Sequence, residues 1–298
     1  MMKVNGKNIE LSNTDKVFFR KNNITKGDLI NYYKKISSIM IFHIEDRPLT
    51  LHRFPNGIDN DGFYQKEIPD YFPSWIDRVS VEKREGGETT YVVCNNKETL
   101  VYLADQGCIT PHIWLSKTSD LEKPDKIIFD LDPASDDYSL IVKAANEIKK
   151  LLDSNNINSY LMTTGSRGVH IVIPIVPEIN FDEARNYAKK IAEAVVEKNP
   201  NDFTVQHRKN KRKGRVFIDY LRNSYGQTSV VPYSIRSLEG APIATPLDWE
   251  ELEFNDFNPR KYNIKNIFRR LGQKEDPWKD MYSKNSSLTK IKDLLSPS

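Results

Sequence analysis

Two aspartates one residue apart are the first residues in this sequence whose type and spacing could do chemistry. They are Asp130 and Asp132, in the run KIIFDLDP at 126–133. A β-strand repeats every two residues, so both carboxylates would share one face, roughly 7 Å apart by Cα, while Phe129 and Leu131 face a core. Ionised neighbours repel, and oxygen ligands suit Mg²⁺ or Mn²⁺. The pair predicts a divalent-metal site for phosphoryl or nucleotidyl transfer, the alternative being a polar strand end without function.

The elements around this pair have an informative order. After the aspartate strand, the sequence predicts a helix at 138–153, strands at 159–163 and 169–174, a helix at 182–198, and strands at 203–206 and 216–221. This β-α-β-β-α-β order is the ferredoxin-like arrangement, whose first strand lies between the third and the last. Asp130 and Asp132 would then have His170 on one flank and Asp219 on the other. Three converging carboxylates could hold two ions that align a hydroxyl, an α-phosphate and a pyrophosphate leaving group.

A glycine-containing turn, TGSRGVH at 164–170, follows the second of these strands and could hold a polyphosphate. Its two glycines would let backbone N–H groups approach a phosphate, and Ser166, Arg167 and His170 could donate to its oxygens. An ordinary hairpin turn has the same composition, and a histidine on a strand is often a core residue. The string alone therefore leaves both interpretations open.

Positive charge is clustered, although the net charge is only +3. The run HRKNKRKGR at 207–215 is either a solvated loop or an electrostatic tether for nucleic acid. Residues 43–75 set basic side chains beside aromatic rings, with Arg53 and Phe63 as candidate DNA contacts; these rings could equally be core. Arg236 is either a basic donor or a salt-bridge partner.

Lys16 and Lys26 lie near the start of a helix predicted to follow Thr25, a suitable N-cap. Free N–H groups at a helix start and basic side chains together suit a phosphate. The alternative is that both lysines are solvated surface residues. Elsewhere, the sequence predicts strands over 78–104 and helices near 264–271 and 287–295.

The composition limits the class of protein. The chain has 298 residues, of which 38% are hydrophobic and 29% charged, as in a folded globular protein with an ample core. No apolar run approaches the roughly 20 residues of a membrane helix, and the N-terminus lacks a signal-peptide pattern, so we expect a cytoplasmic protein without a membrane partner. Cys94 and Cys108 are too few for a four-cysteine zinc site, so we expect no zinc.

Several motifs in the same order resemble a known family. IFDLDP, GSRGVH and VFIDYLRN, at 128–133, 165–170 and 216–223, are similar to the polymerase domain of bacterial and archaeal ligase D, the end-joining branch of the archaeo-eukaryotic primase superfamily. The resemblance covers nearly the whole chain, including TDKV at 14–17, TKGD at 25–28, PHIW at 111–114, GQT at 226–228 and TPLDW at 245–249.

The resemblance implies an α+β primase-polymerase fold that forms a single domain over residues 1–298. Residues 1–125 would form an N-terminal α/β lobe that binds DNA ends, packed with an RRM-like catalytic lobe, 126–298, which ends in a helical tail. We expect no ligase or nuclease domain.

The resemblance also assigns roles to matching residues. Asp130, Asp132 and Asp219 would be the catalytic ligands of two Mn²⁺ or Mg²⁺ ions. The remaining matches fall into three groups: His112, Ser166, Arg167, His170 and Arg236 for the NTP or dNTP substrate; Lys16 and Lys26 for the 5′-phosphate of a DNA end; and Arg208, Lys209, Lys211, Arg212 and Lys213 for bringing DNA ends together. Arg167 often has a lysine counterpart in the family, so the charge is kept while the donor geometry differs.

The implied activity is template-directed nucleotidyl transfer that fills short gaps at 5′-phosphorylated DNA ends in non-homologous end joining, typically with ribonucleotides. A separate DNA ligase would complete the repair, and Ku is a candidate partner. One alternative is a primase that starts chains de novo, against which the lack of a cysteine cluster argues. Another is a non-catalytic RRM-like nucleic-acid-binding module, whose central strand would carry stacking aromatics where this chain carries aspartates.

Overall fold

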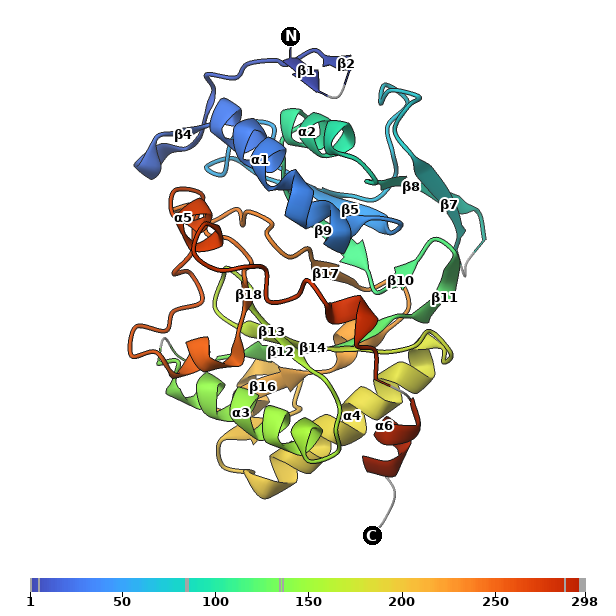
Figure 1. The fold of residues 1–298 in the computed structure, drawn as a ribbon, viewed down its shortest axis with the longest axis vertical. Helices are drawn as coiled ribbons and strands as arrows, with labels where there is room; N and C mark the ends of the chain where they lie inside the picture. Colours follow the sequence, from blue (N-terminus) through green and yellow to red (C-terminus); the bar gives the residue numbers. More distant parts are fainter. Residues whose placement is uncertain are drawn as a thin grey trace. The chain divides into compact units, whose positions relative to one another are not determined.

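The computed structural model describes residues 2–4, 6–83, 86–133, 135, 137–286 and 288–294 (Figure 1). The chain forms two compact units. Unit 1 comprises residues 1–119, 228–244 and 263–267, and unit 2 comprises residues 120–227, 245–262 and 268–298. The division therefore differs from the contiguous boundary at residue 125 that the sequence suggests, because two later segments return to unit 1.

Unit 2 is built on a six-stranded mixed sheet with the order β15-β16-β12-β14-β13-β18. Its strands are β12 (Lys126–Asp132), β13 (Tyr160–Thr163), β14 (Val169–Pro174), β15 (Phe203–Thr204), β16 (Val216–Asp219) and β18 (Pro246–Leu247). As predicted, β12 lies between β14 and β16, and it runs antiparallel to both. The β-α-β-β-α-β order is confirmed, with β16 as its last strand and β15 added beside it at the edge.

Helices α3 (Ser139–Asp153) and α4 (Phe181–Lys198) cover one face of this sheet (Figure 1). Ile127, Phe129 and Leu131 of β12 point into that face and are fully buried against the apolar sides of both helices. Each such side chain stabilises the fold by about 2 kcal/mol through burial. Because side chains alternate along a strand, Asp130 and Asp132 are held on the opposite face.

The remaining elements of unit 2 are short. They are β11 (Asp120–Pro124), the 3₁₀ turns η2 (Lys209–Lys211), η3 (Leu221–Asn223), η4 (Trp249–Glu253) and η5 (Met281–Ser283), and α6 (Leu288–Leu294). The tail is fixed to the sheet by Trp278, whose indole N–H donates to the Leu161 carbonyl at 2.9 Å. The boundary between the units falls within α5 (Ile267–Leu271).

Unit 1 contains a second six-stranded sheet, with the order β17-β9-β5-β8-β7 and β6 paired to β5. Its strands are β5 (Pro48–Arg53), β6 (Phe63–Gln65), β7 (Arg78–Glu82), β8 (Glu88–Val93), β9 (Cys108–Trp114) and β17 (Thr228–Val230). Around them lie β1 (Met2–Val4), β2 (Lys7–Ile9), β3 (Val17–Phe19), η1 (Arg20–Asn22), β4 (Ile24–Thr25), β10 (Ser116–Lys117), α1 (Lys26–Ile44) and α2 (Lys97–Asp105).

Helix α1 begins where the sequence predicts, because Thr25 and Asp28 form a capping box. Helix α2 does not match the prediction: a strand was expected through residue 104, and the structure has a helix there. The Asn96 side chain accepts the Thr99 N–H at 2.9 Å, which caps the helix. The periodicity of a short apolar run does not distinguish a strand from a buried helix. Here the Asn96 cap favours the helix.

Within the described residues, every helix is too short or too polar to cross a membrane.

Candidate active site

Asp130, Asp132 and Asp219 form an acidic centre, whose positions follow from the register of β12 with β14 and β16. Asp130 on β12 lies directly opposite Asp219 on β16 and directly opposite His170 on β14. Asp132 lies two residues further along β12, opposite Phe217. Residues directly opposite on antiparallel strands have Cβ atoms about 5 Å apart. The strand register therefore sets Asp130 between Asp219 and His170, as the predicted strand order requires.

Each carboxylate has a basic neighbour. The Nε2 atom of His170 lies 3.4 Å from Oδ1 of Asp130. The Nε atom of Arg222 donates to Oδ2 of Asp130 at 3.3 Å and lies 4.0 Å from Oδ2 of Asp219. Nη1 of Arg212 is 3.7 Å from Oδ2 of Asp132. Three acidic groups on one sheet face are thus partly balanced by two guanidinium groups.

The three carboxylates differ in acidity for identifiable reasons. Burial and the charge of Asp130 raise the pKa of Asp132. Burial also raises the pKa of Asp219, although the Leu221 N–H, 2.7 Å from its Oδ1, acts in the opposite direction. Burial acts to raise the pKa of Asp130, but His170 and Arg222 together lower it to about 2. The three carboxylates repel one another, as expected of residues that hold a cation.

This donor set fits a hard divalent cation, because carboxylate oxygens are the ligands of Mg²⁺ and Mn²⁺. Within the described ranges, no group of three or more His, Cys, Asp or Glu side chains is already placed to hold a metal ion. Asp130, Asp132 and Asp219 would therefore have to draw together to bind one.

Asn223 links β12, which carries Asp130, to the turn that follows Asp219, and this role was not predicted from the sequence. Its side-chain amide accepts the Ile128 N–H at 2.8 Å and donates to the Ile128 carbonyl at 2.7 Å and the Tyr220 carbonyl at 2.8 Å. The side chain thus continues the ladder of β12 where β16 has ended. With 1% exposure, it is fully enclosed. The sequence signal for this role is the asparagine that ends the motif VFIDYLRN, because a buried amide side chain must form hydrogen bonds with nearby backbone groups.

The glycine-containing turn approaches the end of β12 closely. A Cβ on Gly168 would lie 2.1 Å from the Leu131 carbonyl oxygen, so only glycine fits. The Thr164 hydroxyl donates to the Gly168 carbonyl at 3.0 Å and closes the turn. Nη2 of Arg167 donates to the Pro133 carbonyl at 3.0 Å, while the Ser166 carbonyl accepts from Arg260 at 2.8 Å. The turn therefore brings the predicted phosphate donors to the same end of β12 as Asp132.

The arginine and lysine side chains at 208–213 differ in exposure and contacts. Arg208, Lys209, Lys211 and Lys213 are exposed. Arg212 is less exposed and is fixed to the loop, because its Nε and Nη2 atoms donate to the Gln206 and His207 carbonyls at 3.2 and 3.0 Å. Its guanidinium also lies 3.9 Å from the centroid of the Phe217 ring. With Nη1 3.7 Å from Oδ2 of Asp132, Arg212 faces the acidic centre.

A sequence profile described as the LigD primase-polymerase domain matches residues 25–278 of this chain. The chain belongs to this family. Members of the LigD primase-polymerase domain family are nucleotidyltransferases, so the chain is an enzyme of that class. The family resemblance seen in the sequence is confirmed.

Two LigD relatives are about a third identical to this chain over the regions that match. The bifunctional non-homologous end joining protein LigD of Bacillus subtilis (strain 168) is 33% identical over 276 residues, which cover 92% of this chain and 44% of that protein. The multifunctional non-homologous end joining protein LigD of Mycolicibacterium smegmatis is 31% identical over 247 residues, which cover 82% of this chain and 32% of that protein. The chain therefore spans less than half the length of these relatives.

A solved LigD structure has the same fold. The polymerase domain from Mycobacterium tuberculosis ligase D, in complex with DNA, is similar with a TM-score of 0.86 and 26% identity. The likeness covers 94% of this chain and 99% of that chain. The predicted primase-polymerase fold, with its mixed helices and sheets, is confirmed.

Two residues predicted to bind nucleotide in this LigD-type domain, His112 and Arg236, belong to unit 1 and not to unit 2. His112 lies on β9 with its ring 5.7 Å from that of Tyr64 and 6.5 Å from that of His52. His52 stacks on Tyr64 with ring centroids 4.1 Å apart. Burial and the Arg236 charge lower the pKa of His52 to about 4. His52 and Tyr64, which is 61% exposed, were not assigned roles from the sequence.

The two lysines near the start of α1 have different surroundings. Lys16 is exposed and donates to the Pro55 carbonyl at 3.0 Å. Lys26 is buried, 2.8 Å from Oδ1 of Asp105, and donates to the Ser12 carbonyl at 2.6 Å. The expectation of free N–H groups at this helix start is wrong: the N–H groups of residues 26 and 27 donate to the carbonyls of residues 16 and 14, at 2.8 Å each. The phosphate-binding role of both lysines stays a prediction.

Arg53 and Phe63 also differ in exposure. Arg53 is buried, and its guanidinium donates to the Gln106 carbonyl at 2.8 Å and to the side chains of Gln65 and Tyr71 at 2.6 and 3.0 Å. Phe63 is exposed on β6, with the Arg53 guanidinium 5.5 Å from its ring centroid. Arg53 thus orders the strand that presents Phe63, while contact of either with DNA stays a prediction.

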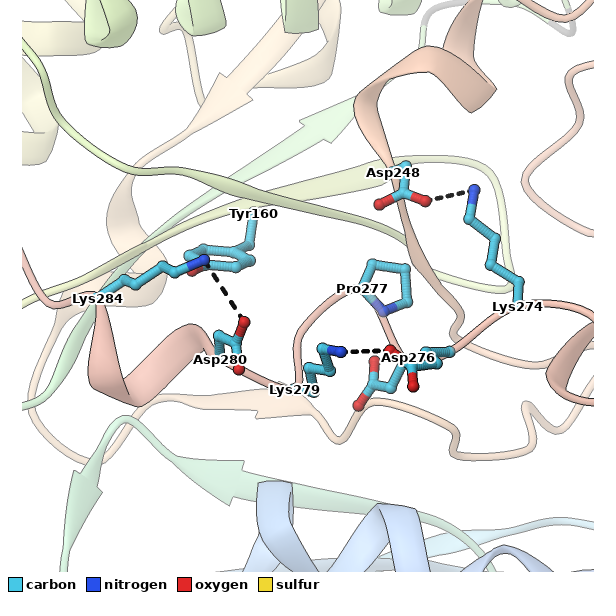
Figure 2. A pocket seen from close by; sticks show the side chains of 9 residues that line it. Tyr160, Asp248, Lys274, Asp276, Pro277, Lys279, Asp280 and Lys284 are labelled. Carbon is cyan, nitrogen blue, oxygen red and sulfur yellow. Dashed lines mark hydrogen bonds and ion pairs between the residues drawn. The ribbon is translucent and has the colours of Figure 1, made fainter.

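A separate charged hollow of about 310 Å³ lies beside β13 in unit 2 (Figure 2). Its three lysines are each paired with an acid, as the dashed lines in Figure 2 show. The pairs are Lys274 with Asp248, Lys279 with Glu275, and Lys284 with Asp280 at 3.5 Å. None of the predicted site residues lines it. Charges already paired in this way leave little attraction for a charged ligand, so we assign it no role.

Proposed function

We propose that this chain is a template-directed repair polymerase that fills short gaps at 5′-phosphorylated DNA ends in non-homologous end joining. It adds nucleotides to a primer 3′ end, with ribonucleotides preferred, and uses two Mn²⁺ or Mg²⁺ ions. The observation that carries this proposal is the register that sets Asp130 opposite Asp219, with Asp132 two residues further along the same face. The family match limits the chemistry to nucleotidyl transfer.

In the proposed reaction, the 3′-hydroxyl oxygen forms a bond to the α-phosphorus of the nucleotide, and the bond from that phosphorus to the pyrophosphate oxygen breaks. Asp130, Asp132 and Asp219 would hold the ions, which when bound stabilise charge on the attacking and leaving oxygens. Ser166 and Arg167, at the same end of β12, would bind the triphosphate through a hydroxyl and a planar guanidinium. His170, whose Nε2 lies 3.4 Å from Oδ1 of Asp130, would also contribute to nucleotide binding.

The same proposal assigns further nucleotide contacts to His112 and Arg236, and DNA contacts to the exposed basic side chains at 208–213. Lys16, which is exposed, would meet the 5′-phosphate directly. Lys26 would contribute positive charge to the same 5′-phosphate site, where it is held by its hydrogen bond to the Ser12 carbonyl. A separate DNA ligase and Ku are the proposed partners, in the cytoplasm.

The test is extension of a labelled primer across a short gap with a 5′-phosphate, comparing NTP with dNTP and Mn²⁺ with Mg²⁺. Asp132→Asn and Asp219→Asn should each reduce the extension rate by about 10³-fold or more, because metal-assisted charge stabilisation is worth several kcal/mol. Asp182→Asn, an exposed carboxylate on α4, is the matched control and should leave the rate unchanged.

Extension at the parental rate by either site variant would contradict the metal assignment. Product formed from nucleotides on an unprimed single strand would instead favour de novo priming. Binding of DNA without any incorporation, in the presence of either metal, would favour a non-catalytic nucleic-acid-binding module.

A further inference from the structure

Arg222 is placed unlike the other basic residues near the acidic centre. It lies in η3, three residues after Asp219, and its side chain is 43% exposed. Its Nε atom donates to Oδ2 of Asp130 at 3.3 Å and is 4.0 Å from Oδ2 of Asp219. The charges of Asp130, Asp219 and Asp132 all raise its pKa, against the effect of its own burial. One guanidinium thus lies within 4.0 Å of two proposed metal ligands, Asp130 and Asp219.

The contacts of Arg222 contrast with those of Arg212. Arg212 is tied by two backbone carbonyls and by the Phe217 ring, so its position does not depend on Asp132. Among the residues that the structure describes, the guanidinium of Arg222 is held only by carboxylates of the acidic centre. If those carboxylates turned toward another cation, Arg222 would lose its anchor, and its exposed side would let it move into solvent.

A guanidinium and a divalent ion would compete for the same two carboxylates. Oδ2 of Asp130 and Oδ2 of Asp219 face Arg222, and Asp130 and Asp219 would also be among the residues that hold the ion. The carboxylates must also draw together to bind an ion, and the guanidinium lies against both of them. A cation of +2 on these oxygens would repel the guanidinium strongly at such a distance.

We propose that Arg222 is a built-in counter-ion of the acidic centre, which stabilises the three carboxylates without a metal and is displaced when a divalent ion binds. Arg222 then lowers the apparent affinity for Mn²⁺ or Mg²⁺ and acts as a positioning residue. This inference rests on the proposed metal-binding role of Asp130, Asp132 and Asp219.

The experiment measures Mn²⁺ binding directly, without nucleotide or DNA, by electron paramagnetic resonance of the free ion. Arg222→Met removes the charge but keeps a long side chain without a hard oxygen ligand. We expect it to bind Mn²⁺ about tenfold more tightly, the equivalent of one charge-assisted hydrogen bond that no longer has to be broken. Arg222→Lys keeps the charge and should bind Mn²⁺ more nearly as the parent does.

Thermal unfolding gives a second readout. In EDTA, Arg222→Met should unfold at a lower temperature than the parent, because Asp130 and Asp219 lose a counter-charge. Saturating Mn²⁺ should then raise its unfolding temperature by more than it raises that of the parent. Lys189→Met, which removes an exposed lysine paired with Glu193 on α4, is the charge-matched control and should leave Mn²⁺ affinity unchanged.

Equal or weaker Mn²⁺ binding by Arg222→Met would overturn the proposal, as would an equal gain in Lys189→Met, which would indicate total charge alone. Asp219→Asn separates the two levels of inference. If the parent binds Mn²⁺ and Asp219→Asn does not, while Arg222→Met binds as the parent does, only the counter-ion role fails. If the parent binds no Mn²⁺, the metal site itself fails.

Discussion

The pKa values of individual carboxylates in this protein depend on neighbours that are distant in sequence. Asp130 and Asp132 have the same side chain two positions apart, yet the pKa of Asp130 is lowered to about 2 and that of Asp132 is raised. The difference comes from His170 and Arg222, which lie against Asp130. The sequence identifies these carboxylates as candidates, but it does not reveal which of them is more acidic.

The sequence also does not show which basic residues are buried. Lys26 and Arg53 are enclosed and fully engaged with protein acceptors, although lysine and arginine are usually exposed. Their acceptors lie 14 and 53 positions away, at Ser12 and Gln106. Only the folded chain brings such partners together, so a motif match can give the position of a basic residue but not its surroundings.

His52 provides a pH test at this scale. Burial and Arg236 lower its pKa to about 4, below the value of about 6.5 expected in the unfolded chain. Between these values the unfolded chain binds the proton more readily, so we expect stability to fall as pH drops from about 6.5 to 4. His52→Gln should reduce this loss. The checks are the NMR titration of the His52 ring and urea unfolding of both proteins at pH 7 and pH 4.5.

An observed midpoint near 6.5 for the His52 ring would contradict this prediction. The parent and His52→Gln losing equal stability at pH 4.5 would assign the acid sensitivity to other groups.

At the scale of elements, the arrangement around the site was predictable where the pattern was long or strictly alternating. The buried run of β12, the turn at 164–168 and the capped helix α4 each carry a local signal, and their order fixes the neighbours of β12. The prediction was wrong at α2, where five consecutive apolar residues, 100–104, fit either a strand or a helix. There the deciding contact is a single side-chain cap at Asn96.

Asn223 connects η3 to β12 through its hydrogen bonds to the Ile128 backbone. Its removal should lower the free energy of unfolding and weaken metal binding. Asn223→Ala leaves the buried N–H and C=O groups of Ile128 without their side-chain partner, a cost of about 2–4 kcal/mol in the free energy of unfolding. It should also weaken Mn²⁺ binding, because the spacing between Asp130 and Asp219 is no longer fixed. Urea unfolding, Mn²⁺ titration and hydrogen exchange of the Ile128 amide measure these effects.

The matched control for this prediction is Asn146→Ala, which removes an exposed amide that donates to Glu253 on the surface of unit 2. It should change stability by no more than about 0.5 kcal/mol. Slow exchange of the Ile128 amide in Asn223→Ala, together with parental Mn²⁺ affinity, would show that the ladder of β12 does not need this side chain.

At the scale of the whole molecule, the chain's division could not be read from the sequence. Residues 228–244 follow the catalytic strands directly but belong to unit 1, where β17 pairs with β9. Pairing between strands more than 100 residues apart leaves no local pattern in either strand. A boundary placed where one motif begins, at residue 126, therefore misses the later return of the chain.

Charge is the property of the whole molecule that bears most directly on DNA binding. The net charge of +3 is small, so we expect binding to depend on where positive charge is exposed. Lys209 and Lys211 are exposed within η2, whereas Arg212 faces Asp132. Replacing both lysines with Gln should lower DNA affinity and reduce the slope of log affinity against log salt by about 1.8, since each phosphate contact contributes about 0.9. Fluorescence anisotropy at several salt concentrations measures this slope.

Two further variants make this prediction specific. Arg212→Gln should leave the slope nearly unchanged while lowering the extension rate, because its guanidinium contacts Asp132 and the loop carbonyls. Lys149→Gln combined with Lys189→Gln removes the same two charges from α3 and α4, where each lysine is paired with an acid on its own helix. A slope change in that control as large as in the η2 variant would mean that total charge, and not the position of the basic loop, governs attraction to DNA.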